Sequence, residues 1–374
     1  MAERTNISFA HHTGSPWIGC TKVNDDCANC YADALDIKRF SKTLGGATKE
    51  NPQRHWGKGM PRVRTVGFWN DARTWNKCPM ICDACGGNFP IREDGYPDHY
   101  VPQTKEDREA GLSEVICKGE TFQRARMFPS LCDWLDDEVP IEWLVDFMKL
   151  VFECQNLTWM LFTKRPENFH RRIYTALDLA IGNCWMSGQA VIFLRDWLQG
   201  KPPKHVWIFA SAGNQKNANV MIPNLLTIPA AVHGVSCEPM TGPVEFQLEW
   251  LAPFKDTDPM LNKTPRVDVV IFGGESDQSR PARACNVQWI ADGVKQCRDA
   301  GALPYVKQLG SHVICDNVNA FDWPQEEGPE LNTSRHTTGF ASGRVMLAHK
   351  SGADMQEWPE ELRIQQLPER KEAA

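Results

Sequence analysis

Short apolar runs alternate with amphipathic segments along most of the chain from about residue 124. This alternation is typical of βα units, in which parallel strands are joined by helices. The apolar runs predict six strands: Arg126–Ser130, Trp159–Thr163, Val206–Ser211, Ala231–Cys237, Val267–Gly273 and Leu303–Gln308. We expect one further strand near Trp17.

The segments between the runs have the periodicity of helices. Ile141–Phe152 and Val287–Cys297 each place apolar residues at spacings of three and four, and Asn286 is a suitable N-cap for the second helix. Six or seven βα units that close on themselves would form a full or partial (β/α) barrel. The fold class predicted from the pattern is therefore α/β, with a barrel or part of one.

Four regions follow from this reading of the chain. Residues 1–70 are expected to hold the first part of the barrel, and residues 122–315 the remainder. Residues 71–121 are rich in Pro, Gly and Asp and read as a small cysteine-rich insertion. Residues 316–374 are expected to form a C-terminal extension.

Polar or small residues follow each apolar run. In a parallel barrel the carboxyl ends of the strands meet on one side, where ligands bind. Any one of these residues has even odds of simply meeting solvent, but together they predict one pocket. They are Asp133, Thr163, Lys164, Arg165, Ser211, Asn214, Ser236, Glu238, Gly273, Gly274, Glu275, Ser276, Lys307 and Gln308.

Composition narrows the class of protein. With 42% hydrophobic and 24% charged residues, the chain is typical of a water-soluble globular protein, and it lacks an apolar run long enough to cross a bilayer. The first ten residues have no secretory signal pattern, so we expect a cytoplasmic protein whose cysteines are thiols or ligands. The net charge of −6 argues against nucleic-acid binding over the whole surface and leaves room only for a local basic groove.

The first cysteine group predicts an iron–sulfur site. Cys20, Cys27 and Cys30 form a CxxxxxxCxxC array that runs directly into a segment of helical character. Structural zinc sites need four ligands, whereas a cubane cluster on three cysteines leaves one iron open for S-adenosylmethionine (SAM). The alternatives are three ordinary thiols, or a zinc site completed by a histidine such as His11 or His12.

The second cysteine group predicts structural zinc. Cys78, Cys82 and Cys85, with Cys117 farther along, supply four thiolates in the insertion. The first three have the CxxxCxxC spacing that is commonest in radical SAM enzymes, but Cys85 runs into GGNFP, which is a poor helix start. An auxiliary iron–sulfur cluster is the alternative, and the other cysteines, Cys132 among them, read as core residues.

Several motifs together resemble the phage- and prophage-associated three-cysteine-motif proteins, a family of unknown function that is regarded as radical-SAM-like. They are GCTKVNDDCANCYA, RMFPSLCDWLDDEVP, LFTKRPENF, SAGNQ, VSCEPMTGPVEF, FGGESDQSRPAR, CRDAGALPYVKQLG and DMQEWPEELRIQQLPE. The resemblance implies a barrel of the radical-SAM type. It also implies a [4Fe–4S] cluster on the first cysteine group, SAM across the strand ends and a phage-encoded protein in a bacterial host.

The resemblance also suggests roles for the strand-end residues. The alternative for each of them is that it forms a structural ion pair and has no role in binding or catalysis. Lys164 and Arg165 suit a carboxylate or phosphate. Glu238 suits a ribose hydroxyl or a catalytic base, and Lys307 a substrate anion or a proton relay. The residues expected to bind the cofactor are Lys164, Ser211, Asn214, Glu238, Gly273, Gly274 and Glu275.

The function expected from this reading is reductive cleavage of SAM to a 5′-deoxyadenosyl radical, with an external electron donor. Phage association suggests a nucleobase substituent as the substrate, for example on thymidine in DNA. A photoproduct-lyase-like DNA repair enzyme would share the cofactor. The alternative of a different class is a zinc-stabilised nucleic-acid-binding module without redox chemistry.

Overall fold

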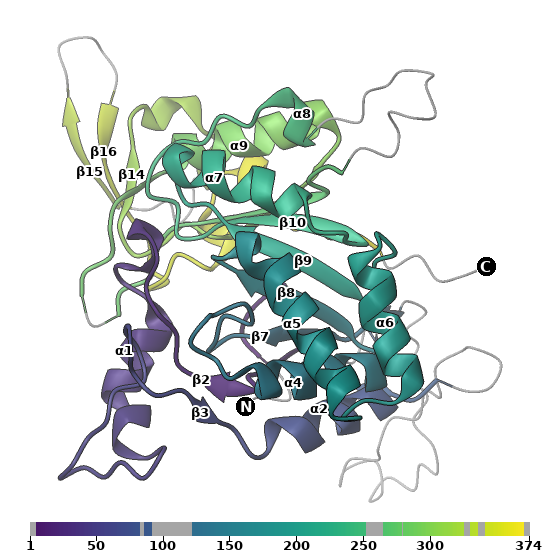
Figure 1. The fold of residues 1–374 in the computed structure, drawn as a ribbon. Coiled ribbons are helices and arrows are strands. Elements are labelled where there is room, and N and C mark those ends of the chain that lie inside the picture. The colour runs from purple at the N-terminus through teal and green to yellow at the C-terminus, as the bar shows by residue number, and fades with distance from the viewer. Residues whose placement is uncertain are drawn as a thin grey trace, which may run out of the picture.

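A computed structural model of the protein describes residues 5–82, 86–91, 122–251, 265–278, 280–324, 330–335 and 341–369. The main sheet has seven strands in the order β1-β7-β8-β9-β10-β11-β13, and every neighbouring pair is parallel. The sheet curls into a half-barrel (Figure 1). Its strands are β1 (His12–Gly14), β7 (Arg126–Pro129), β8 (Thr158–Thr163), β9 (Val206–Ser211), β10 (Val232–Cys237), β11 (Val269–Gly273) and β13 (Leu303–Gln308).

The six strands predicted from the apolar runs are confirmed to within two residues at each end. The first strand of the sheet differs from the prediction, because β1 at His12–Gly14 takes the place expected near Trp17. Trp17 and Ile18 form β2, which pairs with β3 (Val63–Arg64) in a separate two-stranded sheet. Trp17 is apolar because it packs against Phe147 of helix α4, and not because it lies in the barrel. The strand β1 itself has only three residues and no apolar run, so the sequence pattern does not reveal it.

Helices cover the outer face of the half-barrel (Figure 1). Alternate strand residues, such as Trp159 and Leu161, pack into the large core that these helices share. The predicted helices are confirmed as α4 and α9, and Asn286 does cap α9 by accepting a hydrogen bond from the Gln288 amide. The helices are α1 (Tyr31–Lys38), α2 (Phe68–Lys77), α4 (Ile141–Glu153), α5 (Phe169–Gly182), α6 (Gly188–Leu198), α7 (Gln215–Leu226), α8 (Leu248–Leu251) and α9 (Val287–Ala300).

The inner face of the sheet has its own apolar core. The other set of alternate residues, including Met160, Phe209 and Ile271, packs there against Phe9 from the N-terminal segment. A strand that is buried on both faces needs apolar residues at every position, which is why these strands read as continuous apolar runs. The inner core leaves the carboxyl ends of the strands open to form a cavity.

Three short sheets complete the described structure. Strands β4 (Met80–Cys82), β5 (Asn88–Phe89) and β6 (Phe122–Arg124) flank the predicted insertion, and α2 crosses the boundary drawn at residue 71. The C-terminal region adds a sheet of β12 (Cys285–Asn286), β14 (Val313–Cys315), β16 (Ala341–Met346) and β15 (Glu330–Arg335). Short 3-10 helices lie at Asp25–Cys27, Phe40–Lys42, Pro166–Asn168, Val318–Ala320, Met355–Glu357 and Glu360–Leu362.

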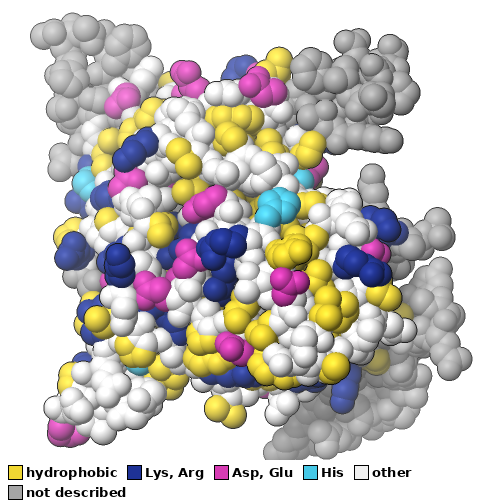
Figure 2. Space-filling view, viewed as in Figure 1, with side chains coloured by type: hydrophobic (Ala, Val, Ile, Leu, Met, Phe, Trp, Pro, Cys, Tyr) yellow, Lys and Arg dark blue, Asp and Glu magenta, His cyan; other side chains and the backbone are white. Residues whose placement is uncertain are grey.

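Helix length and surface charge both bear on the class of protein. In the described part of the chain, each helix is too short or too polar to span a bilayer. On the face shown in Figure 2, lysine and arginine side chains are interspersed with aspartate and glutamate. This mixture agrees with the small negative net charge of the sequence.

Candidate functional site

A cavity of about 380 Å³ lies at the carboxyl ends of the strands. This volume is within the range of small-molecule sites. The structure brings six strand ends together around it, as the sequence predicts. The contributing strand-end residues are Asp133, Thr163, Lys164, Ser211, Ser236, Glu238, Gly274, Glu275, Ser276, Lys307 and Gln308.

Cys20, Cys27 and Cys30 all line this cavity. The loop that carries them leaves β2 at Gly19, whose φ of +119° is a conformation that favours glycine, and it ends where Cys30 caps α1. Cys132 lines the same cavity and is only partly buried, which corrects its interpretation as a core thiol. No pattern in the sequence indicates this position, because a backbone bridge to Gly19, 113 positions away, brings Cys132 to the cavity.

A buried carboxylate fastens the cysteine loop to the barrel. Asp26 is 4% exposed and accepts hydrogen bonds from the Gly213 amide at 3.0 Å and from Asn217 Nδ2 at 2.7 Å. Asn214, predicted to bind the cofactor, instead caps α7 and donates to Asp25 at 3.3 Å. The start of α7 therefore holds the loop in place.

A second clamp joins the loop to the segment after β11. Glu275 accepts hydrogen bonds from Asn29 Nδ2 at 2.8 Å and pairs with Arg283 at 2.8 Å. Burial alone would raise the pKa of Glu275, but the hydrogen bonds from Arg283 and Asn29 hold it below its ordinary value. Glu275 is thus an ionised anchor for the cysteine loop, although it also lines the cavity.

The two glycines before Glu275 have a packing reason of their own. A Cβ on Gly274 would lie 2.1 Å from the Leu309 carbonyl oxygen, and one on Gly273 would lie 3.3 Å from the Gln308 carbonyl oxygen. Only glycine allows the approach at Gly274, whereas a Cβ at Gly273 would make a tight contact. This close packing accounts for the GG pair without a cofactor contact, and Gly273 packs beside the cavity wall.

The walls of the cavity combine amines with aromatic rings. Lys164 Nζ donates to Ser211 Oγ at 3.0 Å, and Lys307 forms an ion pair with Glu238. Phe9, Phe128 and Phe162 line the apolar part, with ring centroids 4.7–5.4 Å apart. The Lys307 ammonium lies 5.9 Å from the centre of the Phe9 ring. The cavity can therefore hold a ligand with an anionic group and a flat apolar face.

Burial favours the protonated form of the Cys20 and Cys30 thiols by raising their pKa values. Burial raises the pKa of Cys20 to about 12, with Asp133 adding to the effect and Arg165 opposing it. Burial also raises the pKa of Cys30. A bound metal would offset this cost, because metals bind the thiolate form.

The donors gathered at this cavity are thiols, which are the ligands that an iron–sulfur cluster would use. Within the described ranges, no three His, Cys, Asp or Glu side chains are placed to hold one metal ion. Each thiolate of a cubane cluster binds a different iron, so the three sulfurs must surround one small volume, and Cys20, Cys27 and Cys30 do line one cavity.

The other metal ligands considered from sequence lie elsewhere. His11 accepts a hydrogen bond from the Arg126 amide at 2.9 Å, and His12 stacks on Trp75 at 4.5 Å, so neither serves the cysteine loop. Of the predicted zinc ligands, Cys78 follows α2 and Cys82 is buried in β4. Cys85 and Cys117 lie outside the described residues, and the zinc site stays a prediction.

Comparison with known proteins identifies the family alone. No curated protein and no solved structure matches the chain. One family model matches residues 4–350, which is nearly the whole chain. The match carries neither a phage origin nor a radical-SAM relationship, and both stay predictions. The chain belongs to the family described as "Protein of unknown function (DUF5131)".

Proposed function

We propose that this protein is a radical SAM iron–sulfur enzyme that acts on a nucleobase substituent. The observation that carries the proposal is the position of Cys20, Cys27 and Cys30 in one cavity at the carboxyl ends of a parallel half-barrel. Parallel α/β sheets bind ligands at this end. Three thiols in a cavity large enough for a small molecule suit a cluster with one open iron.

The three thiolates would hold the cluster, and the cavity would hold SAM beside it. When bound, the pair supplies one-electron cleavage of SAM to methionine and a 5′-deoxyadenosyl radical, which takes a hydrogen atom from the substrate. The two clamps through Asp26 and Glu275 keep the cysteine loop fixed over the cavity. A fixed loop preserves the distance between cofactor and substrate, on which radical transfer depends.

The remaining cavity residues would bind the substrate and orient it. Lys164 and Lys307 supply positive charge for a carboxylate or phosphate, and Ser211 holds the Lys164 ammonium in place. The ion pair between Lys307 and Glu238 can hold or pass a proton at the cavity wall. The phenylalanine rings exclude water from the apolar part of the cavity.

A nucleobase is the substrate class that this wall suits best. Its flat ring can lie against Phe128, since Phe162 already stacks on Phe9 and Phe209, and its phosphate can meet the lysines. Modification of a substituent on thymidine and repair of a photoproduct in DNA would use the same features. The two reactions differ in product, which makes them separate outcomes of one assay.

The test is anaerobic reconstitution of the full chain, with iron, sulfide and zinc counted per chain. A matched variant replaces Cys20, Cys27 and Cys30 by alanine, and a control replaces the buried Cys297 of α9. We expect about four irons in the wild type and the control, none in the triple variant, and 5′-deoxyadenosine from SAM under dithionite. A colourless protein that holds only zinc and leaves SAM intact would refute the proposal and favour a zinc-stabilised binding module.

A further inference from the structure

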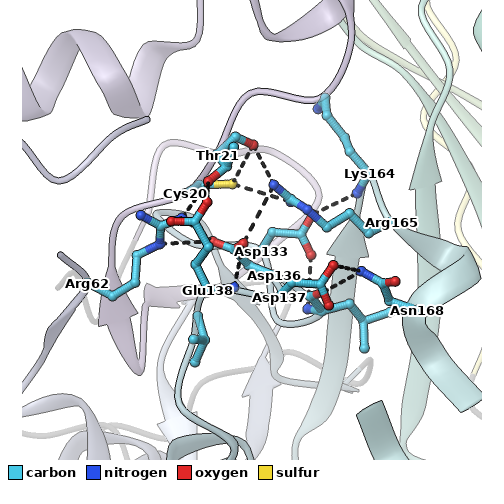
Figure 3. Close-up of polar contacts among 12 residues, drawn as sticks. Cys20, Thr21, Arg62, Asp133, Asp136, Asp137, Glu138, Lys164, Arg165 and Asn168 are labelled. Carbon is cyan, nitrogen blue, oxygen red and sulfur yellow. Dashed lines mark hydrogen bonds and ion pairs between the residues drawn. The ribbon is translucent and has the colours of Figure 1, made fainter. Parts of the chain in front are cut away.

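A buried arginine contacts the sulfur of Cys20. Arg165 follows β8 and is 4% exposed, and its Nη1 lies 3.5 Å from Cys20 Sγ and 2.8 Å from Asp133 Oδ2 (Figure 3). Its other terminal nitrogen donates to the Thr21 carbonyl oxygen. The guanidinium therefore lies between a cavity cysteine and a buried carboxylate.

The partner carboxylate is firmly held. Asp133 is 5% exposed and accepts hydrogen bonds from Thr163 Oγ1 at 2.8 Å, the Lys164 amide at 2.9 Å and the Leu135 amide at 3.0 Å. These donors come from two strand ends, so the position of Asp133 is set by the barrel itself. Arg165 is in turn fixed by Asp133.

A second buried ion pair lies on the far side of Arg165. Asp136 Oδ1 is 3.7 Å from Arg165 Nη2, and Asp136 Oδ2 is 2.8 Å from Arg62 Nη2 (Figure 3). Arg62 contacts Thr21 Oγ1 rather than the sulfur of Cys20. Arg165 is therefore the member of this network that donates to a cysteine sulfur.

We propose that Arg165 and Asp133 set the reduction potential of a cluster on Cys20, in opposite directions. The inference rests on the proposed function, since it needs the cluster to be present. Reduction adds one negative charge to a cluster, and potentials depend on nearby charge and on hydrogen bonds to the sulfurs. The hydrogen bond and positive charge of Arg165 favour the reduced form, and the charge of Asp133 disfavours it.

Two variants separate these effects. Arg165→Lys keeps the positive charge but loses the planar fork that reaches sulfur and carboxylate together. Asp133→Asn keeps the shape of the side chain and removes its charge. The matched control is Arg172→Lys on α5, because Arg172 is also buried, at 5% exposed, and donates to the Val139 carbonyl oxygen instead of a sulfur.

The experiment is a redox titration of the anaerobically reconstituted full chain, followed by electron paramagnetic resonance, with iron counted per chain. We expect a lower midpoint potential in Arg165→Lys, a higher one in Asp133→Asn, and an unchanged one in Arg172→Lys. If Arg165→Lys does not retain its cluster, the sign of the Asp133→Asn shift decides the proposal.

The outcomes distinguish this inference from the proposed function. A wild-type protein that binds no cluster overturns both. Clusters that load fully but show unchanged potentials, or shifts of the same sign in the Arg165 and Asp133 variants, overturn only the inference. That result would leave Arg165 as a structural residue, and the cluster would still support the proposed function.

Discussion

Replacing Asp26 by asparagine should loosen the cysteine loop from the barrel. Asp26 accepts hydrogen bonds from the Gly213 amide and the Asn217 side chain at 3.0 and 2.7 Å, and it is 4% exposed. Both donors bind the same oxygen, Oδ2, so an asparagine that keeps its oxygen there turns its amide group toward Asn214 Nδ2, which lies 3.5 Å from Asp26 Oδ1. The new amide group then faces another donor, and both bonds to Oδ2 lose their charged acceptor.

The cost follows from the two bonds. A hydrogen bond to a charged group contributes about 1.5–3 kcal/mol, and a buried donor left without a partner costs about 1–3 kcal/mol. Because asparagine keeps the acceptor oxygen and the shape of the side chain but loses the charge and adds a buried donor without an acceptor, we expect the free energy of unfolding to fall by about 2–4 kcal/mol. The matched control is Asp178→Asn on α5, since Asp178 is exposed and lies away from the cysteine loop, and the change should stay within about 0.5 kcal/mol.

Urea unfolding of both variants measures the free energy by linear extrapolation. Hydrogen exchange over residues 20–30 then shows whether the loss is local to the cysteine loop. We expect faster exchange there in Asp26→Asn than in Asp178→Asn. Equal stability and equal exchange in the two variants would refute the assignment of Asp26 as the anchor of the loop.

Two further predictions concern packing and pH. Gly274→Ala should lower the free energy of unfolding by about 1–3 kcal/mol, because the new Cβ would clash with the Leu309 carbonyl oxygen. Gly188→Ala is the control and should not lower it, because the space around Gly188 is open. Urea unfolding compares the two variants. Burial, assisted by Arg126, lowers the pKa of His11 to about 3, so the unfolded chain takes up a proton below pH 6.5 that the folded chain does not. Stability should therefore fall as pH drops, by about 2 kcal/mol from this group at pH 5. Urea unfolding at pH 7.5 and 5 should show a weaker dependence in His11→Gln, and an identical dependence would contradict the assignment.

The barrel strands were predictable because their signal is local. Strands such as Val206–Ser211 and Leu303–Gln308 are buried on both faces, and their positions before the polar carboxyl end are therefore apolar. The three-residue β1 has no apolar run, so the sequence pattern does not predict it. The apolar residues at Trp17, which pack against α4, instead predict the first barrel strand at the wrong place. The sequence also predicts that the polar strand ends meet in one cavity, because the carboxyl ends of parallel strands lie along one edge of the sheet.

The partners of individual side chains were not predictable. Arg165 and Cys20 are 145 positions apart, and Asn29 and Glu275 are 246 positions apart. Glu275 reads in sequence as a cofactor contact, whereas in the fold it is also paired with Arg283. A motif shows which chemical groups are present, but it does not show which of them neutralise one another.

The sequence by itself determined the α/β class, the order of the strands along the chain and the set of residues at their ends. The tertiary structure decided that the sheet is a half-barrel, that Cys132 joins the cavity, and that Arg165 reaches Cys20. The physical reason is the separation along the chain of the residues that interact. Hydrophobic periodicity is set by burial at neighbouring positions, whereas contacts between loops depend on how far the whole sheet curls and which strand ends it brings together.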